Sequence, residues 1–534
     1  MALSMSTVDL NNAWKKTCKV LFGEEIGDIE EYADWLSEII DANVLRKSTI
    51  SGKAVAFSIK EYAESSKWIS FDEIDQEQRK KFEPLNINEI KDIDSIRAAI
   101  SDRVYYCGDI ILGNSKEVVQ SSNITDGFCV YDSAQFFNIK YVGYSTVGRE
   151  NSYCFGSHAP GGSEFIIRCS QTVNVKRAFE LLASTNCSDC YYVYGLDDCS
   201  DCLFSFTLKN KRNCIGNLEI DKDKFNSLKA KILAEIVEEL KHKKRVQSLL
   251  DIVRKSRMQG LGKRAAKEVQ KIQPALTPDK RIIERAFSDT TKLLFGRVLD
   301  NIDDYGNWLL EHTHKLQETK SALSRERIVW QPYGISLMPM PEDRLITLEE
   351  AHQLEKLKIP VSEAENISIR NAHESIGKIA FLKVDLKYGN NVNMIDSTFY
   401  IDSSNCYKFS MTINTKYCAY GMWANKSHDC FGVDSVLESN FCLKCYHSTK
   451  LTRCFEMDNC KNCSDSMFCH NCENIHDSMF CFNTKNKRYA VGNVEYPAAV
   501  YAKLKTKLLE KIANELEKHK KLEWSIYNIG AKPH

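Results

Sequence analysis

The chain has 534 residues, of which 43% are hydrophobic and 27% charged, and its 72 basic side chains balance 72 acidic ones. This composition is typical of a globular protein of two to four domains, and zero net charge excludes a partner selected by overall charge alone. Met1–Leu10 lacks the features of a signal peptide and no run of 18 apolar residues occurs, so we expect neither signal-directed secretion nor a membrane span.

The chain contains an internal duplication. Thr17–Glu38 resembles Thr290–Glu311 at an offset of 273 residues, and Leu208–Ile220 resembles Thr484–Tyr496 at an offset of 276. The second offset holds without a gap from about residue 115 to 252. Each half therefore begins with a helical or mixed lead, continues through a middle region and ends in a helical tail, and acidic helices with Trp35 and Trp308 are expected in the leads.

The middle region of each half has a period of twelve. Seven twelve-residue blocks start at residue 127 and seven more at residue 403, and of their 18 cysteines 17 lie at a multiple of three from a block start, Cys129 being the exception. A fixed short period is typical of a stacked solenoid. Twelve extended residues make a loop about 40 Å around, so its inward side chains must be small. Phe136, Phe409 and Met457 are too large and imply local widening.

We expect a row of inward cysteines in the second half, made by Cys406, Cys418, Cys430, Cys442 and Cys454. Beside such inward positions stand larger residues that would form an apolar ladder. They are Tyr131, Phe155, Phe179, Tyr191 and Leu203, then Tyr407, Phe431, Phe455, Met467 and Met479. We expect helices of the same chain to cover this ladder; the alternative is an assembly face.

The tails carry apolar side chains at helical spacing, which predicts helices that pack on a core and cap the solenoids. The stripes are Phe225, Leu228, Ile232, Ile236 and Leu240, then Tyr501, Leu504, Leu508, Ile512 and Leu516. The first tail continues into a basic linker with 13 Lys or Arg against 4 Asp or Glu between Lys241 and Glu284. This linker is either a solvated bridge or a nucleic-acid contact. The candidate contacts are Lys241, Lys243, Lys244, Arg245, Arg254, Lys255, Arg257, Lys263 and Arg264.

Two CxxC pairs, Cys460/Cys463 and Cys469/Cys472, have the spacing of a zinc site. Their counterparts in the first half are Ser184, Cys187, Val193 and Leu196, so three of the four ligands are missing there. We therefore favour free thiols that fill a narrow core and expect no cofactor. Zinc held by these four cysteines and disulfides between adjacent coils stay open as alternatives.

Signals of catalysis are weak. Glu180 and Glu456 occupy equivalent positions, each three residues after Arg177 or Arg453, and we expect an Arg–Glu ion pair in each half. The chain has no GxSxG, HExxH or dinucleotide-binding motif. We therefore expect no enzyme.

The phrases "NCSDSMFCHNCENIHDSMFCFNTKNKRYAVGN" and "NCSDCYYVYGLDDCSDCLFSFTLKNKRNCIGN" resemble a family of uncharacterised cysteine-rich repeat proteins. Its members come from archaea, candidate-phylum bacteria and their tailed viruses. The resemblance covers roughly residues 115–235 and 391–510. It implies a repeat fold and a virion or assembly setting, and it supplies no catalytic residues.

The expected fold is α+β, with two tandem copies of a parallel β-helix of twelve-residue coils and α-helical caps at each end. The segments are a lead at 1–114, a β-solenoid at 115–222, a helical tail and basic linker at 223–285, a second lead at 286–390, a second β-solenoid at 391–496 and a C-terminal helix at 497–534.

The expected function is a non-enzymatic structural or assembly protein, a virion component with a protein partner or a homo-oligomeric state, located in the cytoplasm or the virion. The alternative is a module that binds nucleic acid or protein and contains zinc.

Overall fold

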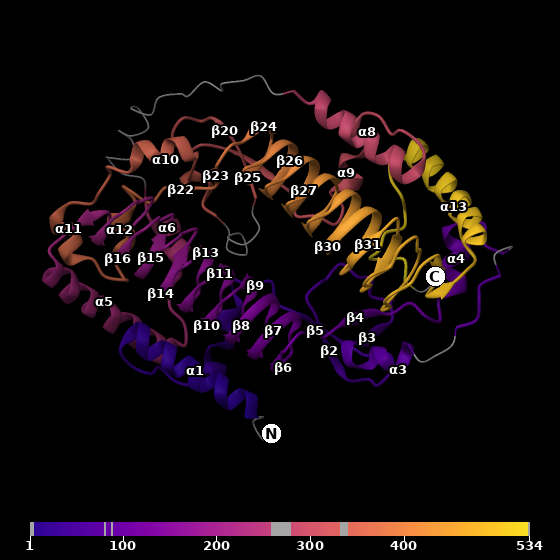
Figure 1. The fold of residues 1–534 in the computed structure, drawn as a ribbon. Helices are drawn as coiled ribbons and strands as arrows, with labels where there is room; N and C mark the ends of the chain where they lie inside the picture. Colours follow the sequence, from indigo (N-terminus) through magenta and orange to yellow (C-terminus); the bar gives the residue numbers. More distant parts are fainter. Residues whose placement is uncertain (1–4, 79–81, 87–88, 258–278, 332–339, 532–534) are drawn as a thin grey trace.

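The computed structural model describes residues 5–78, 82–86, 89–257, 279–331 and 340–531. It is an α+β structure with two closed sheets of parallel strands and helices along their outer sides and ends (Figure 1). Among the described residues, no helix is both long and apolar enough to cross a membrane.

The first sheet occupies the middle of the first half. Its strands are β5 (Ile111–Leu112), β6 (Lys116–Val119), β7 (Ser122–Tyr131), β8 (Ala134–Gly143), β9 (Thr146–Arg149), β10 (Ser152–Phe155), β11 (His158–Gly161), β12 (Glu164–Ile167), β13 (Ser170–Val173), β14 (Lys176–Leu182), β15 (Ser188–Tyr194), β16 (Ser200–Leu203), β17 (Arg212–Ile215) and β18 (Leu218–Glu219). Parallel partners are mostly twelve residues apart, so that Cys154 lies between Val142 and Ile166.

The second sheet repeats this register. Its strands are β23 (Lys387–Tyr388), β24 (Val392–Ile395), β25 (Thr398–Ile401), β26 (Ser404–Ile413), β27 (Lys416–Asn425), β28 (His428–Phe431), β29 (Asp434–Leu437), β30 (Asn440–Asp458), β31 (Lys461–Ser464) and β32 (Met467–His470). Cys406 pairs with Cys418 and Cys430 with Cys442.

A left-handed residue recurs at nearly every third position of both sheets. Asp132, Gln135 and Asn138, for example, have φ of 41°, 60° and 52°. Each such residue turns the chain between two extended ones, and asparagine and aspartate tolerate this conformation better than most residues. Backbone groups bond the adjacent repeat, as when Asp132 N donates to Val119 O at 3.2 Å. Cys129 has φ 56° and occupies one of these turns, which accounts for its exceptional place in the cysteine pattern.

The interior of each sheet is filled by residues spaced at multiples of three. In the first sheet the buried cluster includes Val130, Cys154 and Cys190, and in the second Cys406, Cys442 and Met457. Interior hydroxyls and thiols donate to the carbonyl two residues earlier, as Ser133 Oγ does to Tyr131 O at 2.9 Å. Most small polar side chains are therefore satisfied inside this narrow core, with the buried hydroxyls of Thr172 and Thr412 as exceptions among the described residues.

Helices lie along the sides and ends of both sheets. The α-helices are α1 (Met5–Phe22), α2 (Ala33–Ser37), α3 (Ile74–Gln78), α4 (Ile93–Ile100), α5 (Lys222–Lys243), α6 (Leu249–Lys255), α8 (Arg281–Phe295), α9 (Gly306–Leu309), α10 (Leu348–Leu354), α11 (Val361–Asn366), α12 (Ala372–Ile376) and α13 (Ala498–His519). The 3₁₀ turns are η1 (Ile29–Tyr32), η2 (Phe71–Glu73), η3 (Ile302–Tyr305) and η4 (Glu342–Arg344).

The apolar ladder is covered by helices of the same chain, as expected. Phe155 meets Trp14 of α1 edge-on, with ring centroids 5.4 Å apart, and Phe431 meets Phe287 of α8 at 5.3 Å. The stripes of α5 and α13 also enter the cores, apart from Leu228, which is only partly buried.

Each half also contains a small mixed segment with short strands. The first mixed segment, 44–108, holds β1 (Val44–Lys47), β2 (Ala54–Phe57), β3 (Trp68–Ser70) and β4 (Tyr106–Gly108); the second, 317–383, holds β19 (Gln317–Lys320), β20 (Arg327–Trp330), β21 (Leu345–Ile346) and β22 (Leu382–Lys383). β3–β4 and β21–β22 are both parallel pairs. A carboxylate in each segment binds a serine of the same segment, Glu73 to Ser48 and Glu350 to Ser321.

These mixed segments pack across the two halves. The first contacts the end of the second sheet, where Asn483 Nδ2 donates to Tyr105 O at 2.7 Å and Arg103 Nη1 to Gly492 O at 3.2 Å. The second contacts the end of the first sheet, where Tyr194 Oη donates to Lys383 O at 2.7 Å. Figure 1 shows α4 beside the hairpin of β33 (Ala490–Val491) and β34 (Val494–Glu495), and α11 and α12 beside β16.

The mixed segments therefore add to the helical caps that were expected at the ends of the two sheets. Buried residues of the first mixed segment share a core cluster with β32 and α13, and those of the second share one with β16 and α5. Each copy therefore contributes to closing the other, and α5 and α13 provide only part of the cover.

Candidate functional site

A buried ion pair joins the lead, sheet and tail of the first half. Arg168 Nε donates to Glu180 Oε1 at 2.6 Å, and the two side chains are 1% and 0% exposed. Arg168 also contacts Trp35 O and lies 3.2 Å from Glu38 Oε2. Glu180 Oε2 accepts a hydrogen bond from Leu249 N at 2.9 Å, and burial raises the pKa of Glu180 despite Arg168. Enclosed on all sides, this pair has no room for a substrate.

The second half repeats the cluster with lysine in place of arginine. Lys444 Nζ donates to Trp308 O at 3.0 Å and to Glu311 Oε2 at 2.9 Å, and it lies 3.6 Å from Glu456 Oε1. Glu456 accepts a hydrogen bond from Ile526 N at 2.7 Å. Burial raises the pKa of Glu456 to about 7, against the opposing effect of Lys444.

The expected pairing of Arg177 with Glu180 is wrong. Arg177 instead binds Asp189 with two hydrogen bonds of 2.7 and 2.6 Å, and Arg453 binds Asp465 in the same way at 2.7 Å. Residues twelve apart lie side by side on adjacent repeats, whereas Arg177 and Glu180 occupy successive left-handed positions of one repeat, with φ of 51° and 49°. The arginines still have matching environments in the two halves, as the duplication predicts.

A second buried network lies where the first mixed segment meets the second sheet. Asp458 accepts a hydrogen bond from Tyr62 Oη at 2.6 Å and lies 2.8 Å from His470 Nδ1 and 3.3 Å from His447 Nδ1. Cys107 N donates to His470 Nε2 at 3.0 Å, so His470 presents its Nδ1 proton to Asp458. Burial raises the pKa of Asp458, but hydrogen bonds with the two histidines lower it overall. Burial lowers the pKa of His447, but its hydrogen bond with Asp458 raises it overall.

A cavity of about 40 Å³ lies near this network, between the halves, and His314 Nδ1 lies 3.0 Å from Asp434 Oδ2 in its wall. Burial lowers the pKa of His314, but hydrogen bonding to Asp434 raises it overall. A space of this size holds only a few water molecules, so it is too small for an organic substrate.

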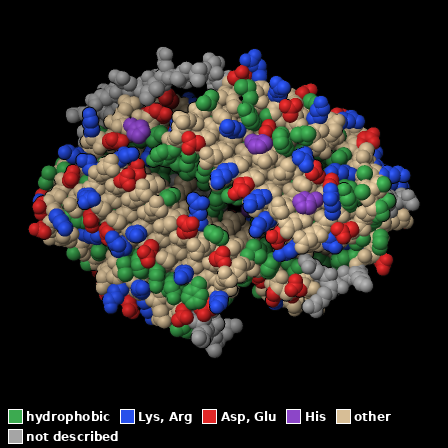
Figure 2. All heavy atoms as spheres, viewed as in Figure 1, with side chains coloured by type: hydrophobic (Ala, Val, Ile, Leu, Met, Phe, Trp, Pro, Cys, Tyr) green, Lys and Arg blue, Asp and Glu red, His purple; other side chains and the backbone are tan. Residues whose placement is uncertain are grey.

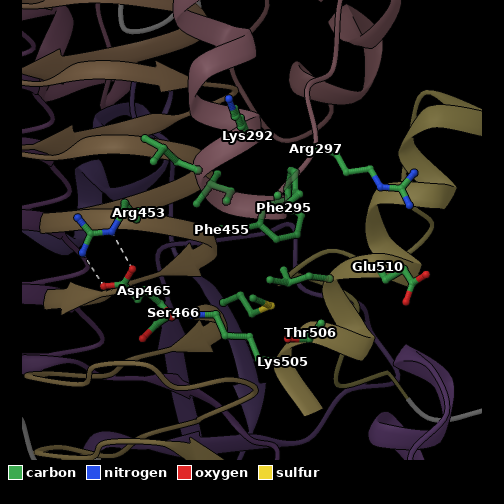
Figure 3. Close-up of a pocket in the computed structure, with 15 residues that line it drawn as sticks. Lys292, Phe295, Arg297, Arg453, Phe455, Asp465, Ser466, Lys505, Thr506 and Glu510 are labelled. Atoms are coloured by element: carbon green, nitrogen blue, oxygen red, sulfur yellow. Dashed lines mark hydrogen bonds and ion pairs between the residues drawn. The ribbon is translucent and has the colours of Figure 1, made fainter. Parts of the chain in front are cut away.

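A larger cavity of about 410 Å³ opens between α8, α13 and the second sheet (Figure 3). Its floor is apolar and its rim carries charged side chains. The apolar lining includes Phe295, Phe455, Met467 and Leu509, and the charged lining consists of Lys292, Arg297, Arg453, Asp465, Lys505 and Glu510. This is the candidate site with room for a small molecule.

The basic side chains proposed for nucleic-acid contact are mostly paired with acidic ones. Lys244 lies 2.6 Å from Glu31 and Arg245 3.1 Å from Glu38. Further ion pairs join Lys241 to Glu24, Lys243 to Glu239 and Arg254 to Asp251. Lys255 donates a hydrogen bond to Gln247. Arg257 is the last residue of the described range 89–257, and Lys263 and Arg264 lie outside the described residues. Acidic and basic side chains are interspersed over the face in Figure 2.

All 21 cysteines lie in the described part of the chain, and all are buried free thiols. Cys460 Sγ donates to Cys469 O at 3.3 Å, and Cys463 Sγ to Lys461 O at 3.2 Å. Burial raises the pKa of Cys472, but hydrogen bonds from Cys460 and Cys469 bring it to about 7. Within the described residues, no group of three or more Cys, His, Asp or Glu side chains is arranged to hold a metal ion.

Comparison of the chain with family models, curated proteins and solved structures found no match.

Two features escaped the sequence reasoning. The Tyr62–Asp458–His470 network joins residues about 400 positions apart, and no local pattern marks it. The larger cavity did leave a signal, because Met467 corresponds to Tyr191 at the offset of 276, a large change in side-chain shape at an otherwise repeated position.

Proposed function

We propose that the two closed sheets are β-solenoids with twelve-residue coils, and that the chain is a rigid, non-enzymatic structural or assembly component of the kind that virions use. The crossed packing of the mixed segments carries this proposal. Because each copy closes the other, the two halves share their cores and resist separation, which suits a load-bearing part.

The buried polar groups also favour a structural role. The buried carboxyl groups of Glu180, Glu456 and Asp458 have perturbed pKa values, which would suit catalysis. Their side chains are nearly or wholly inaccessible to solvent, apart from that of His447 at 20%. We infer that they join segments distant in sequence rather than act on a substrate.

Sedimentation velocity over a hundredfold range of protein concentration, followed by negative-stain electron microscopy, tests the proposal. We expect a regular homo-oligomer or particle whose mass does not depend on added nucleic acid. A chain that stays monomeric throughout, and that binds DNA or RNA with an affinity that falls steeply with salt, would support the nucleic-acid-binding alternative instead.

A further inference from the structure

The cavity between α8, α13 and the second sheet can be compared with its counterpart in the first half. At the offset of 276, Met467 in the cavity corresponds to Tyr191, and Lys505 corresponds to Lys229. At the offset of 273, Leu294 of α8 corresponds to Leu21 of α1. The duplication therefore shows what side chain this space holds when it is filled.

In the first half a phenol ring occupies the position. Tyr191 is 2% exposed and its hydroxyl donates to Leu21 O at 2.8 Å, in the last turn of α1. Lys229 Nζ lies 5.2 Å from the centre of the Tyr191 ring and 3.2 Å from Asp201 Oδ1. The ring is thus held by one carbonyl acceptor and one cation above its face.

The second half keeps these holding groups around the cavity but has methionine in place of the ring. Leu294 O lies in the last turn of α8, where helix carbonyls lack helical partners, and no donor among the described residues reaches it. Lys505 Nζ lies 3.6 Å from Asp477, the counterpart of Asp201. Phe295 and Phe455 supply aromatic walls and meet edge-on at 5.1 Å.

Three of the four cations at the rim are already paired with carboxylates, which favours a neutral ligand. Arg453 is bound to Asp465, Arg297 lies 3.1 Å from Glu517 and Lys505 is next to Asp477, so these cations are already compensated. An anionic ligand would have to compete with those carboxylates. A neutral ring with one hydroxyl donor would instead meet apolar walls, an acceptor and a cation.

We propose that this cavity binds a small phenol, with the ring against Phe295, Phe455 and Met467 and the hydroxyl donating to Leu294 O. Benzene fits an apolar cavity of about 150 Å³, so a space of about 410 Å³ admits a phenol ring together with a substituent. The site goes beyond the structural role proposed above, and it makes the two copies unequal in ligand binding.

The test uses 4-methylphenol, which has the chemical form of a tyrosine side chain, and the full chain labelled with ¹³C at its methionine methyl groups. We expect saturable binding of one molecule per chain and a ring-current shift of the Met467 methyl signal, assigned with Met467→Leu. Toluene lacks the hydroxyl and should bind about tenfold more weakly.

Met467→Tyr should abolish binding, because its own ring would fill the space. Leu437→Tyr is the matched control: it introduces the same side chain at an exposed strand position that does not line the cavity, and it should bind like the wild type. The proposal is overturned if the wild type does not bind 4-methylphenol, or if binding leaves the Met467 signal unchanged. Equal binding by Met467→Tyr would overturn it as well. If Met467→Tyr does not fold, the Met467 methyl signal of the wild type still tests whether 4-methylphenol binds in the cavity.

Discussion

Glu456 should make the protein less stable as the pH rises from acid to neutral. Its carboxyl is fully buried, and burial raises its pKa from 4.5 to about 7. Below pH 4.5 the group is protonated in both the folded and unfolded chain. Between pH 4.5 and 7 the unfolded chain releases the proton while the folded chain keeps it, so the free energy of unfolding falls. A shift of this size corresponds to about 3 kcal/mol.

Glu456→Gln isolates this effect. Glutamine has an oxygen that can accept the hydrogen bond from Ile526 N. Lys444 retains its hydrogen bond to Glu311, which is 2.9 Å long. The variant cannot ionise at position 456, so its free energy of unfolding should lack this decline. Relative to the wild type, it should gain about 3 kcal/mol of stability between pH 4.5 and pH 8.

Urea unfolding of both proteins at half-unit steps of pH measures the difference. Glu180→Gln is a matched comparison in the first half, where burial also raises the carboxyl pKa, and its difference curve should have the same sign. If the curves of the wild type and Glu456→Gln run parallel from pH 4.5 to 8, Glu456 does not hold its proton in the folded state and the reasoning fails.

Three further outcomes are expected. In an NMR titration, His314 and His447 should titrate with a pKa above 6.5, and His158 and His312 with a pKa near 4. The stability that His314 and His447 contribute is fully present below pH 6.5 and is lost as the pH rises through their raised pKa. A pKa below 6.5 for His314 or His447 would contradict the expectation. Replacing both Cys463 and Cys472 with serine should lower stability by about 1–3 kcal/mol per site and leave the metal content unchanged in elemental analysis, whereas the loss of one zinc per chain would show a metal site. Tyr62→Phe removes a donor to Asp458 and should cost about 1–3 kcal/mol in urea unfolding, and an unchanged midpoint and slope would refute the role of that bond.

Much of the interior could be predicted from spacing alone. Cysteines at multiples of three indicated inward positions, and the buried cluster of the second sheet, with Cys406, Cys442 and Cys472, keeps that spacing. Cys129 broke the pattern because it occupies a left-handed turn. The cover over Phe155 and Phe431 followed from the need to bury a continuous apolar row.

Features that depend on contacts between distant segments could not be predicted. Arg177 and Glu180 are close in sequence, but Arg177 binds Asp189 on the adjacent repeat because pairs twelve apart lie side by side. The crossed packing of the mixed segments depends on contacts such as that of Asn483 with Tyr105, for which no periodic signal exists. For the larger cavity the sequence holds only the change from Tyr191 to Met467 between the copies, and the surrounding walls come from segments distant in sequence.

The proposed β-solenoids can be tested most directly by locating the sulfur atoms in crystals through their anomalous scattering. We expect one row of sulfur atoms with a spacing of about 4.8 Å, made by Cys406, Cys418, Cys430, Cys442 and Cys454. We also expect no stronger peak among Cys460, Cys463, Cys469 and Cys472 above the zinc absorption edge. Five sulfurs scattered over different faces, or four converging on one strong peak at about 2.3 Å, would contradict the proposal.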